Sequence, residues 1–459
     1  MRFHGGCNIR LAGRPSDLVD VLPEPEVLRL PLQSCRFDFK EICVKEGEEV
    51  HPGQALAKDL DHFAVPLLAP RAGTVRLEEA EGHITLVDIH KEPEEPYRPE
   101  EPLEHAPRDM DSVGKKRYKL LALGAWQFFR DAYSGRLPNP FGVPSAVIVS
   151  TLALEPFLAR GDVQIRKRLA SFTRGLEHLQ SLLEYQPIYL VLPDIGSGFA
   201  QRVRDTIRGY AWAQLVGIPL RYGLDHSAAI ARGLGLKRNG EGPVWALDAA
   251  GALAVDRALT LSLPSTVRIV SLGGPAAEKP RHLKAMPGYP LSDMVETRKA
   301  ESSTRIIAGG VFTGSEVPES QLGLDAECAG LTLLREHEER ELLSFMRPGF
   351  DRASYSRCFL SAVRGAFIEN LTTALRGERR ACVSCGYCEE VCPARIMPYL
   401  IHKHLYQEGY EEAERIGVDR CLRCGLCSYV CPSKIELRGQ FIDAQELLEQ
   451  ERPAEEVAS

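Results

Sequence analysis

One cysteine spacing occurs twice near the C-terminus of this 459-residue chain, and it constrains the fold more than any other feature. Each copy reads C-x2-C-x2-C-x3-C-P. The first copy contains Cys382, Cys385, Cys388 and Cys392, and the second contains Cys421, Cys424, Cys427 and Cys431. This run holds [4Fe-4S] clusters in proteins that carry two of them. The tail is therefore predicted to form a small module around two iron–sulfur clusters.

The spacing also predicts which thiolates share a cluster. Three closely spaced thiolates on one loop can bind three irons of a cubane, while the fourth cysteine begins a helix and reaches the other cluster. The proline after each fourth cysteine fixes the turn that follows. We therefore expect one cluster on Cys382, Cys385, Cys388 and Cys431, and the other on Cys421, Cys424, Cys427 and Cys392.

Zinc and disulfide bonds are the alternatives for these cysteines. Structural zinc sites usually pair two C-x2-C segments across a gap, and a third cysteine two residues on, followed by C-P, is not their pattern. Residues 1–7 lack the apolar run of a signal peptide, so we expect a reducing cytoplasm, where disulfides fit poorly. The other five cysteines follow no ligand spacing and are interpreted as small buried apolar residues: Cys7, Cys35, Cys43, Cys328 and Cys358.

Length and charge limit the other possibilities. A chain of this length is expected to form three to four domains, each burying its own core. The formal net charge is −7 and basic residues are not massed on one stretch, so nucleic acid is not an expected partner. No apolar run reaches the length of a membrane span. The chain is expected to be soluble, with any membrane connection made through partner subunits.

Residues 1–95 consist of short strands broken by glycine and proline. The segments 44–56 and 69–75 are similar to the two halves of the barrel-sandwich hybrid of lipoyl and biotinyl carriers. Such carriers place the modified lysine on the hairpin between those halves, but here His62 and Phe63 stand near that position and Lys58 is displaced. We expect an unmodified scaffold domain. A Glu/Pro-rich linker follows over residues 96–114.

Residues 115–262 alternate between strand-like and helix-like segments. Strands over 146–150, 188–192 and 218–222, separated by an amphipathic helix and a helix through 202–215, predict a Rossmann-like parallel sheet covered on both faces. Gly196 and Gly198 lie where a dinucleotide-binding loop would lie, but Gln201 replaces the third glycine of G-x-G-x-x-G. A tight turn needs glycine for its backbone alone. A nucleotide-binding role and a purely structural role therefore both stay open for this loop.

The remaining segments complete a multidomain α/β plus β architecture. Residues 263–335 return to strand character and are similar to a β-grasp domain of the soluble-ligand-binding (SLBB) type. Residues 336–375 are predicted to be a helical connector with an apolar face. Residues 376–459 form the predicted α-helical ferredoxin-like module with two [4Fe-4S] clusters.

This order of domains resembles one superfamily, which contains the NqrA subunit of the sodium-pumping NADH:quinone reductase and the RnfC subunit of the Rnf ferredoxin:NAD complex. The opening G-C-N-I-R-L-A-G-R-P of residues 6–15 resembles NqrA, as do residues 271–275, 291–293 and 345–357. All eight cluster cysteines are kept, as in RnfC, whereas the NqrA subunit of the well-known pumps has lost most of them. The chain therefore resembles NqrA in its body and RnfC in its tail.

One segment separates the two branches. The Rnf branch binds FMN and receives NADH at a loop of the type G-x-G-G-A-G-F-P-T, and the corresponding residues 123–130 contain one glycine with Trp126, Phe128 and Phe129. A phosphate cradle needs backbone amides that no side chain covers. FMN is therefore not expected, and the isolated chain is not expected to react with NADH.

The resemblance implies an electron-transferring peripheral subunit of a membrane-bound, Na⁺-translocating NADH:quinone oxidoreductase-type complex. Two [4Fe-4S] clusters are the implied cofactors, and the membrane subunits of an Nqr- or Rnf-type complex are the implied partners, at the cytoplasmic face of the inner membrane. Quinone is a further ligand that the resemblance allows, and the sequence identifies no residues for its site. No catalytic residue is identified, and the aromatic residues Trp126–Phe129 and Phe141 are interpreted as core in preference to a quinone cleft.

Two other functions explain the clusters equally well. One is an Rnf-like subunit that binds FMN and NADH, and the other is an electron-relay adaptor without a substrate site. The direction of electron flow is not set by the spacing, because the potentials of such clusters range from roughly −700 to +450 mV.

Overall fold

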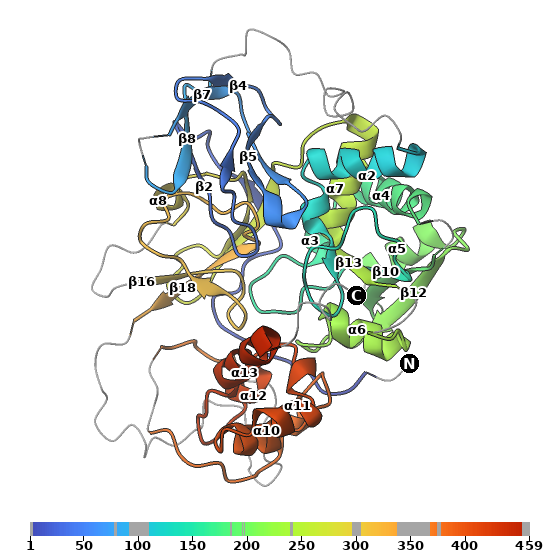
Figure 1. The fold of residues 1–459 in the computed structure, drawn as a ribbon, viewed down its shortest axis with the longest axis vertical. Coiled ribbons are helices and arrows are strands. Elements are labelled where there is room, and N and C mark those ends of the chain that lie inside the picture. Colours follow the sequence, from blue (N-terminus) through green and yellow to red (C-terminus); the bar gives the residue numbers. More distant parts are fainter. Residues whose placement is uncertain are drawn as a thin grey trace.

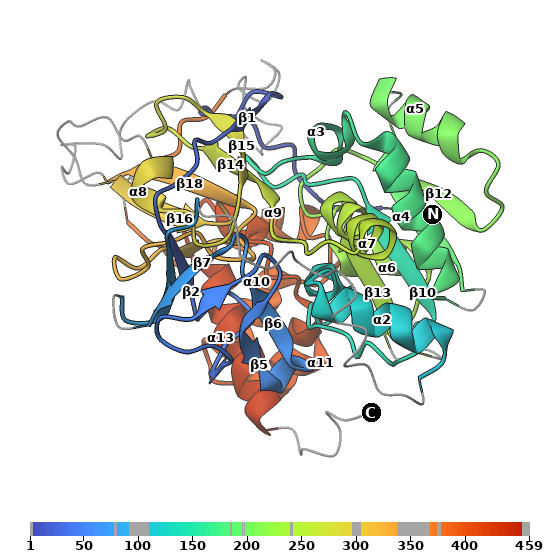
Figure 2. The same ribbon diagram turned by 90° about the horizontal axis from the view of Figure 1, so that it is seen from above.

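The computed structural model describes residues 3–77, 80–90, 110–183, 186–194, 196, 198–238, 242–295, 304–336, 368–373 and 378–451. Three parts rich in β-structure form the body of the protein, and a helical module made by the last described residues lies below them (Figure 1). In the turned view, the α/β part and the sheet that contains β14 and β18 lie on opposite sides of the body (Figure 2). The predicted mixed α/β multidomain architecture is confirmed at this level.

The first part consists of two small antiparallel sheets around a shared core. One sheet has the order β2 (Leu28–Pro31), β8 (His83–Val87), β7 (Gly73–Arg76) and β4 (Glu49–Val50), and the other has β3 (Glu41–Ile42), β5 (Ala55–Asp59) and β6 (Val65–Leu68). Alternate residues of a strand share a face, and Leu28 and Leu30 of β2 are accordingly both fully buried. A short 3₁₀ turn, η1 (Leu60–His62), closes the hairpin between β5 and β6.

The second part is an α/β domain with a five-stranded sheet. Its strand order is β12 (Ala213–Ile218), β11 (Ile188–Pro193), β10 (Ala146–Ser150), β13 (Val244–Asp248) and β9 (Arg130–Asp131). The first four strands are parallel and β9 is an antiparallel edge strand. Apolar side chains cover both faces, as a parallel sheet requires.

Helices from the intervening segments provide that cover. One face packs against α2 (Ser112–Ala122), α4 (Leu169–Ser181), α5 (Gly198–Ile207) and α7 (Ala249–Leu261), and the other packs against α6 (Ser227–Leu234). The short helix α3 (Gly161–Ile165) precedes α4. Gly175 lets α4 and α7 approach closely, because a methyl group there would collide with the carbonyl oxygen of Ala252.

The boundary between α5 and β12 differs from the prediction. The helix expected through 202–215 ends at Ile207, and the strand expected at 218–222 is β12 at 213–218. The backbone amide of Tyr210 donates to the carbonyl of Ile207, and that of Ala213 donates to the carbonyl of Tyr210, so a turn fills the gap. Gly209 is a poor helix former, which explains why the helix stops although Tyr210 and Trp212 continue the apolar pattern.

The third part is a six-stranded sheet with the order β1, β15, β14, β18, β16, β17. Its strands are β1 (Val19–Val21), β14 (Arg268–Gly273), β15 (Arg281–Ala285), β16 (Thr304–Ala308), β17 (Ser315–Glu316) and β18 (Gly330–Arg335), with the short helix α8 (Leu291–Met294) between β15 and β16. Strand β1 is parallel to β15, although more than 250 residues separate them. The N-terminal segment therefore contributes to this sheet and not to the two small sheets.

The C-terminal module is helical and has its own core. It contains α9 (Tyr387–Glu390), α10 (Pro398–Leu405), α11 (Tyr410–Arg415), the 3₁₀ turn η5 (Val418–Arg420), α12 (Leu426–Tyr429) and α13 (Leu437–Glu451). Ile401, Val418, Leu426 and Phe441 are fully buried there. Most of the predicted linker and connector, together with Cys358, lies outside the described residues. Among the residues that are described, no helix is both long and apolar enough to cross a bilayer.

Candidate functional site

The two cysteine loops of the helical module have the same backbone conformation. Each adopts the left-handed region one residue before its second cysteine, at Ser384 (φ 52°) and Arg423 (φ 55°). Each adopts it again directly after the second cysteine, at Gly386 (φ 79°) and Gly425 (φ 77°), where α9 and α12 begin. Glycine is favoured at these positive φ values because it has no Cβ. The repeated sequence thus folds as a repeated structure.

Two cavities in the module are each surrounded by four cysteines. The cavity that we call the outer cavity is lined by Cys382, Cys385, Cys388 and Cys431, and its empty space, part of which is open to solvent, is about 340 Å³. The inner cavity is lined by Cys392, Cys421, Cys424 and Cys427, and its empty space, also partly open to solvent, is about 350 Å³. Each cavity combines three cysteines of one repeat with the fourth cysteine of the other. This is the grouping that the spacing predicts, and the ligand bonds themselves stay a prediction.

The remaining lining of the cavities is largely apolar. Val383, Tyr399, Ile435 and Leu437 contribute to the outer cavity. The inner cavity is lined by a similar set that includes Ile396, Leu422, Leu426 and Phe441. Because such walls keep water away from the buried sulfur atoms, they disfavour the charged form of those thiols.

Burial accordingly shifts the acidity of the cysteines. It raises the pKa of Cys388 to about 11 and that of Cys421 to about 11. Burial and neighbouring cysteines also raise the pKa of Cys424 and Cys427. Coordination by a metal deprotonates a thiol outright, so metal binding at these sites is coupled to proton release.

The donor atoms fit iron–sulfur clusters. Each lining provides four thiols and contains no carboxylate and no imidazole. Within the described ranges, no three His, Cys, Asp or Glu side chains are arranged to hold a single metal ion. A cubane does not need that arrangement, because each thiolate binds a different iron atom.

Residues that the sequence did not indicate hold the inner cavity against the body. The hydroxyl of Tyr222, just after β12, donates to the carbonyl of Cys424 at 2.8 Å. Phe312, from the loop after β16, stacks on Tyr222 with ring centres 5.1 Å apart, and Tyr429 packs edge-on against Phe312 at 5.4 Å. Glu155 fixes that loop by accepting hydrogen bonds from the backbone amides of Phe312 and Thr313. No local sequence pattern identifies these long-range partners.

The glycines of the predicted nucleotide loop are not held in place by close contacts. Neither Gly196 nor Gly198 has a positive φ. A methyl group at Gly196 would meet nothing within 4 Å, and one at Gly198 would meet only the Arg202 side chain, at 3.8 Å. Residues 195 and 197 lie outside the described ranges. A nucleotide-binding role for this loop stays a prediction without support from backbone geometry.

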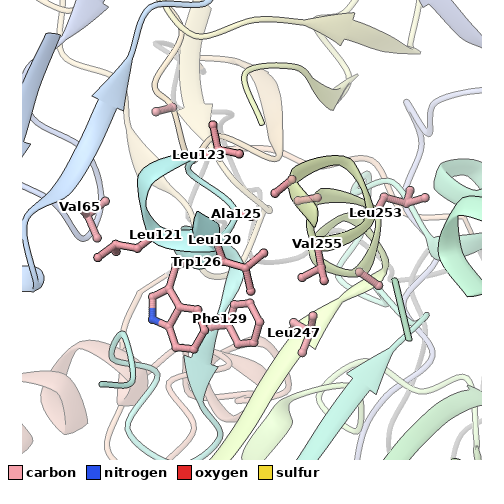
Figure 3. Packing of buried hydrophobic residues seen from close by; sticks show 14 of the residues in the cluster. Val65, Leu120, Leu121, Leu123, Ala125, Trp126, Phe129, Leu247, Leu253 and Val255 are labelled. Carbon is pink, nitrogen blue, oxygen red and sulfur yellow. The ribbon is translucent and has the colours of Figure 1, made fainter. Parts of the chain in front are cut away.

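The aromatic segment after α2 belongs to the core (Figure 3). Trp126 and Phe129 are fully buried and stacked, with ring centres 4.2 Å apart, and the indole nitrogen of Trp126 donates to the carbonyl of Pro138 at 2.9 Å. The core interpretation is confirmed for these two residues. It is wrong for Phe141, which is 49% exposed because it lies in a surface turn. Phe128 is partly buried beneath the guanidinium of Arg268, at 4.2 Å.

The hairpin tip of the first part carries His62 in a fixed position. Its Nδ1 atom lies 2.9 Å from the carboxylate of Asp59, a buried residue that also accepts the backbone amides of Asp61 and His62. Lys58 lies within β5, paired with Glu41, and not at the tip. The tip thus carries an imidazole at the place where a carrier domain has the amine of a lysine. That the domain is unmodified stays a prediction.

Comparisons with known proteins match three segments to families. Residues 374–432 match a 4Fe-4S dicluster domain, residues 269–319 the NQRA C-terminal domain, and residues 113–220 the NqrA second alpha/beta domain. The last two segments fall on the six-stranded sheet and on the α/β domain, respectively.

Several relatives match over most of the chain, and each is the NqrA subunit of a Na(+)-translocating NADH-quinone reductase. The one from Alcanivorax borkumensis is 29% identical over 386 residues, covering 82% of both chains. The one from Actinobacillus pleuropneumoniae serotype 5b is 27% identical over 427 residues, covering 90% of both. The one from Photorhabdus laumondii is 26% identical over 430 residues, covering 91% of this chain and 92% of the relative. An NAD+-reducing [NiFe]-hydrogenase aligns over 52% of this chain and 50% of that chain, with 13% identity and a TM-score of 0.38, too weak a likeness to support an argument.

Proposed function

We propose that this chain is an electron-transferring peripheral subunit of a Na(+)-translocating NADH-quinone reductase-type complex. Its similarity to the NqrA subunits of such reductases supports the proposal and confirms the resemblance predicted above. The observation that carries the proposal is the pair of cavities, each surrounded by four cysteines drawn from both repeats. Each cavity is proposed to hold one [4Fe-4S] cluster.

The residues around each cavity have separate tasks in this proposal. Four thiolates bind the cluster, which when bound takes up or releases one electron at a time. The apolar walls limit the access of water, and backbone amides that donate to the sulfur atoms, such as that of Arg423 to Cys421, would adjust the potential of a bound cluster. No side chain has to move a proton to or from a substrate. The chain therefore acts as a relay whose donor and acceptor are other groups.

The core position of Trp126 and Phe129 argues against the Rnf-like alternative. These side chains fill the stretch that is glycine-rich in the flavin-binding branch, and Leu123 and Ala125 beside them are also fully buried. A flavin phosphate needs exposed backbone amides. We infer that the isolated chain binds no FMN and does not oxidise NADH, so that electrons reach it from a partner.

Membrane subunits at the cytoplasmic face of the inner membrane are the proposed partners, by analogy with the complex named for the relatives. Sodium translocation is proposed for the complex and not for this chain alone. Quinone is assigned to neither of the two cavities described above, because both are assigned to the cysteine sites. An adaptor without any substrate site would use the same two cavities, and its partners would distinguish it.

Purification of the tagged chain from membranes of its native host tests the proposal. We expect membrane subunits of the reductase to co-purify, and NADH to bleach the iron–sulfur absorbance of the complex but not that of the isolated chain. Dithionite should bleach both. Prompt bleaching of the isolated chain by NADH, together with stoichiometric FMN, would favour the Rnf-like function instead. Co-purification with soluble proteins alone would favour the adaptor.

A further inference from the structure

Resting on the proposed function, we propose that the two cavities have different partners. The outer cavity exchanges electrons with a separate protein that carries a one-electron redox centre. The inner cavity exchanges electrons only with the outer cavity and with the body of the complex. The proposal follows from which cysteines reach the surface and from what covers the others.

The outer cavity opens onto the surface of the module. Cys385 is exposed, and Val383, which also lines the cavity, is 66% exposed. The exposed Ser384 between them accepts a hydrogen bond from the ammonium group of Lys403 at 3.1 Å, which holds the loop. Electron transfer slows steeply with distance, and a redox protein that covers Val383 and Cys385 would lie directly over the outer site.

The body covers one side of the inner cavity. Cys424 is buried, and its carbonyl accepts the hydroxyl of Tyr222. The guanidinium of Arg232, from α6, donates to the carbonyl of Arg420 at 3.0 Å. Gly223 packs so tightly on the module that a methyl group there would lie 3.0 Å from Leu426. A protein partner could reach this side of the inner cavity only by displacing the α/β domain.

The N-terminal segment and the six-stranded sheet complete the cover. The backbone amide of Gly6 donates to the carbonyl of Val391 at 2.8 Å, next to Cys392 of the inner cavity. From the sheet, Phe312 reaches the inner loop, where a methyl group at Gly425 would lie 3.5 Å from its ring. Three segments distant in sequence thus meet beside the inner cavity, whereas within the described ranges the outer cavity is lined by residues of the helical module alone.

The chemistry of the outer face indicates what kind of partner fits it. Val383 is an exposed apolar residue beside the cavity, with the exposed charges of Arg380, Lys403 and Glu389 on the same cysteine loop and adjoining helices. An apolar centre with a polar rim of both signs is typical of a small, transient protein interface. A [4Fe-4S] cluster held by these thiols would take up one electron at a time, whereas a hydride carries two. The proposed partner is therefore a one-electron protein carrier.

Flavodoxin hydroquinone is a suitable protein probe for the outer face. Its anionic hydroquinone gives up one electron to become the neutral semiquinone, and that electron reduces one cluster of the reconstituted chain. Stopped-flow absorbance follows both partners. Val383→Asp should slow this reaction about tenfold, because a charge placed at the centre of an interface must lose its water. The matched control is Leu447→Asp, on α13 ten residues beyond Leu437, where the side chain is 42% exposed. Its rate of reduction by flavodoxin should lie within about twofold of the parent rate.

The outcomes separate this inference from the proposed function. If dithionite reduces the parent and both variants, and flavodoxin reduces all three at equal rates, the outer face is not the exchange site and the inference is wrong. If dithionite reduces no cluster in the parent, the proposed function itself fails.

A second measurement does not depend on a partner or on the folding of Val383→Asp. In the dithionite-reduced parent, a water-soluble dysprosium chelate should accelerate the electron spin relaxation of one cluster signal more than the other. That signal should be the one that Cys385→Ser abolishes. Equal acceleration of both signals would contradict the assignment of an outer and an inner site.

Discussion

Replacing Glu155 by alanine should loosen the contact between the six-stranded sheet and the inner cavity. The carboxylate of Glu155 is buried at the junction and accepts three hydrogen bonds from one loop. The amides of Phe312 and Thr313 donate to Oε1, both at 2.8 Å, and the hydroxyl of Thr313 donates to Oε2 at 2.6 Å. Alanine would remove all three acceptors and leave the two amides without partners in a site that water reaches poorly.

The expected magnitude follows from the number of bonds. A hydrogen bond to a charged group contributes about 1.5–3 kcal/mol, and bonds made by one carboxylate are not additive. We take about 3 kcal/mol as the loss in the free energy of local opening, which corresponds to roughly a hundredfold faster exchange of the two amides.

Hydrogen–deuterium exchange of the peptide that contains Phe312 and Thr313 measures this change. Glu177→Ala is the matched control, because Glu177 lies in the same domain and accepts the hydroxyl of Tyr210 at the surface. The control substitution should leave the exchange rate of the peptide with Phe312 and Thr313 unchanged. Exchange in Glu155→Ala within about threefold of the parent would refute the anchoring role, since such a ratio corresponds to less than 1 kcal/mol.

Three further predictions concern other parts of the chain. Cys431→Ser should abolish the same cluster signal as Cys385→Ser, while Cys392→Ser should abolish the other, and electron paramagnetic resonance of the reduced variants checks this grouping. His226 is the N-cap residue of α6, and burial lowers its pKa from 6.5 to about 4. As the pH falls from 6.5 to 4, the histidine of the unfolded chain therefore takes up a proton, while that of the native protein stays neutral. Its contribution to stability is therefore lost over that window. His226→Asn, which keeps a side-chain acceptor for the cap, should lose less unfolding free energy than the parent between pH 7 and 5.5 in urea titrations; an equal loss would exclude this role. Mass spectrometry of the protein from its native host should show neither lipoate nor biotin on Lys58.

Asp225 is the reason why the effect of His226 must be measured as a difference. Burial raises the pKa of this neighbouring carboxyl to about 6, so the native protein holds a proton there that the unfolded chain releases as the pH rises above 4. That group favours the native state at low pH, in the opposite sense to His226. Comparison of variant and parent removes the contribution of Asp225, which both share.

Features that depend on local pattern were predictable from the sequence. The strand at 146–150 has the predicted bounds, because five consecutive residues with four fully buried apolar members form a strand in the middle of a parallel sheet. The grouping of the eight cysteines around two cavities was predictable, because their spacing alone shows which three lie on one loop and which fourth cysteine follows them. The stacking of Trp126 on Phe129 agrees with their bulk, which is suited to a core and not to a phosphate loop.

Features that depend on distant partners were not predictable. Periodicity shows that a side chain is buried but not what it meets, so nothing in the sequence pairs Cys7 with Tyr222 or places β1 beside β15. Glu155 looks like any other glutamate until the fold brings it to Thr313, 158 residues away. The end of α5 was missed for a related reason, because the apolar pattern continues through a turn that Gly209 introduces.

The iron and acid-labile sulfide content of the anaerobically reconstituted chain tests the central claim most directly. Two cavities of four cysteines each predict about eight iron atoms and eight sulfides per chain, with a broad absorbance that dithionite bleaches. Stoichiometric zinc without iron in an anaerobic preparation, or iron for only one cluster after full reconstitution, would contradict a relay through two clusters.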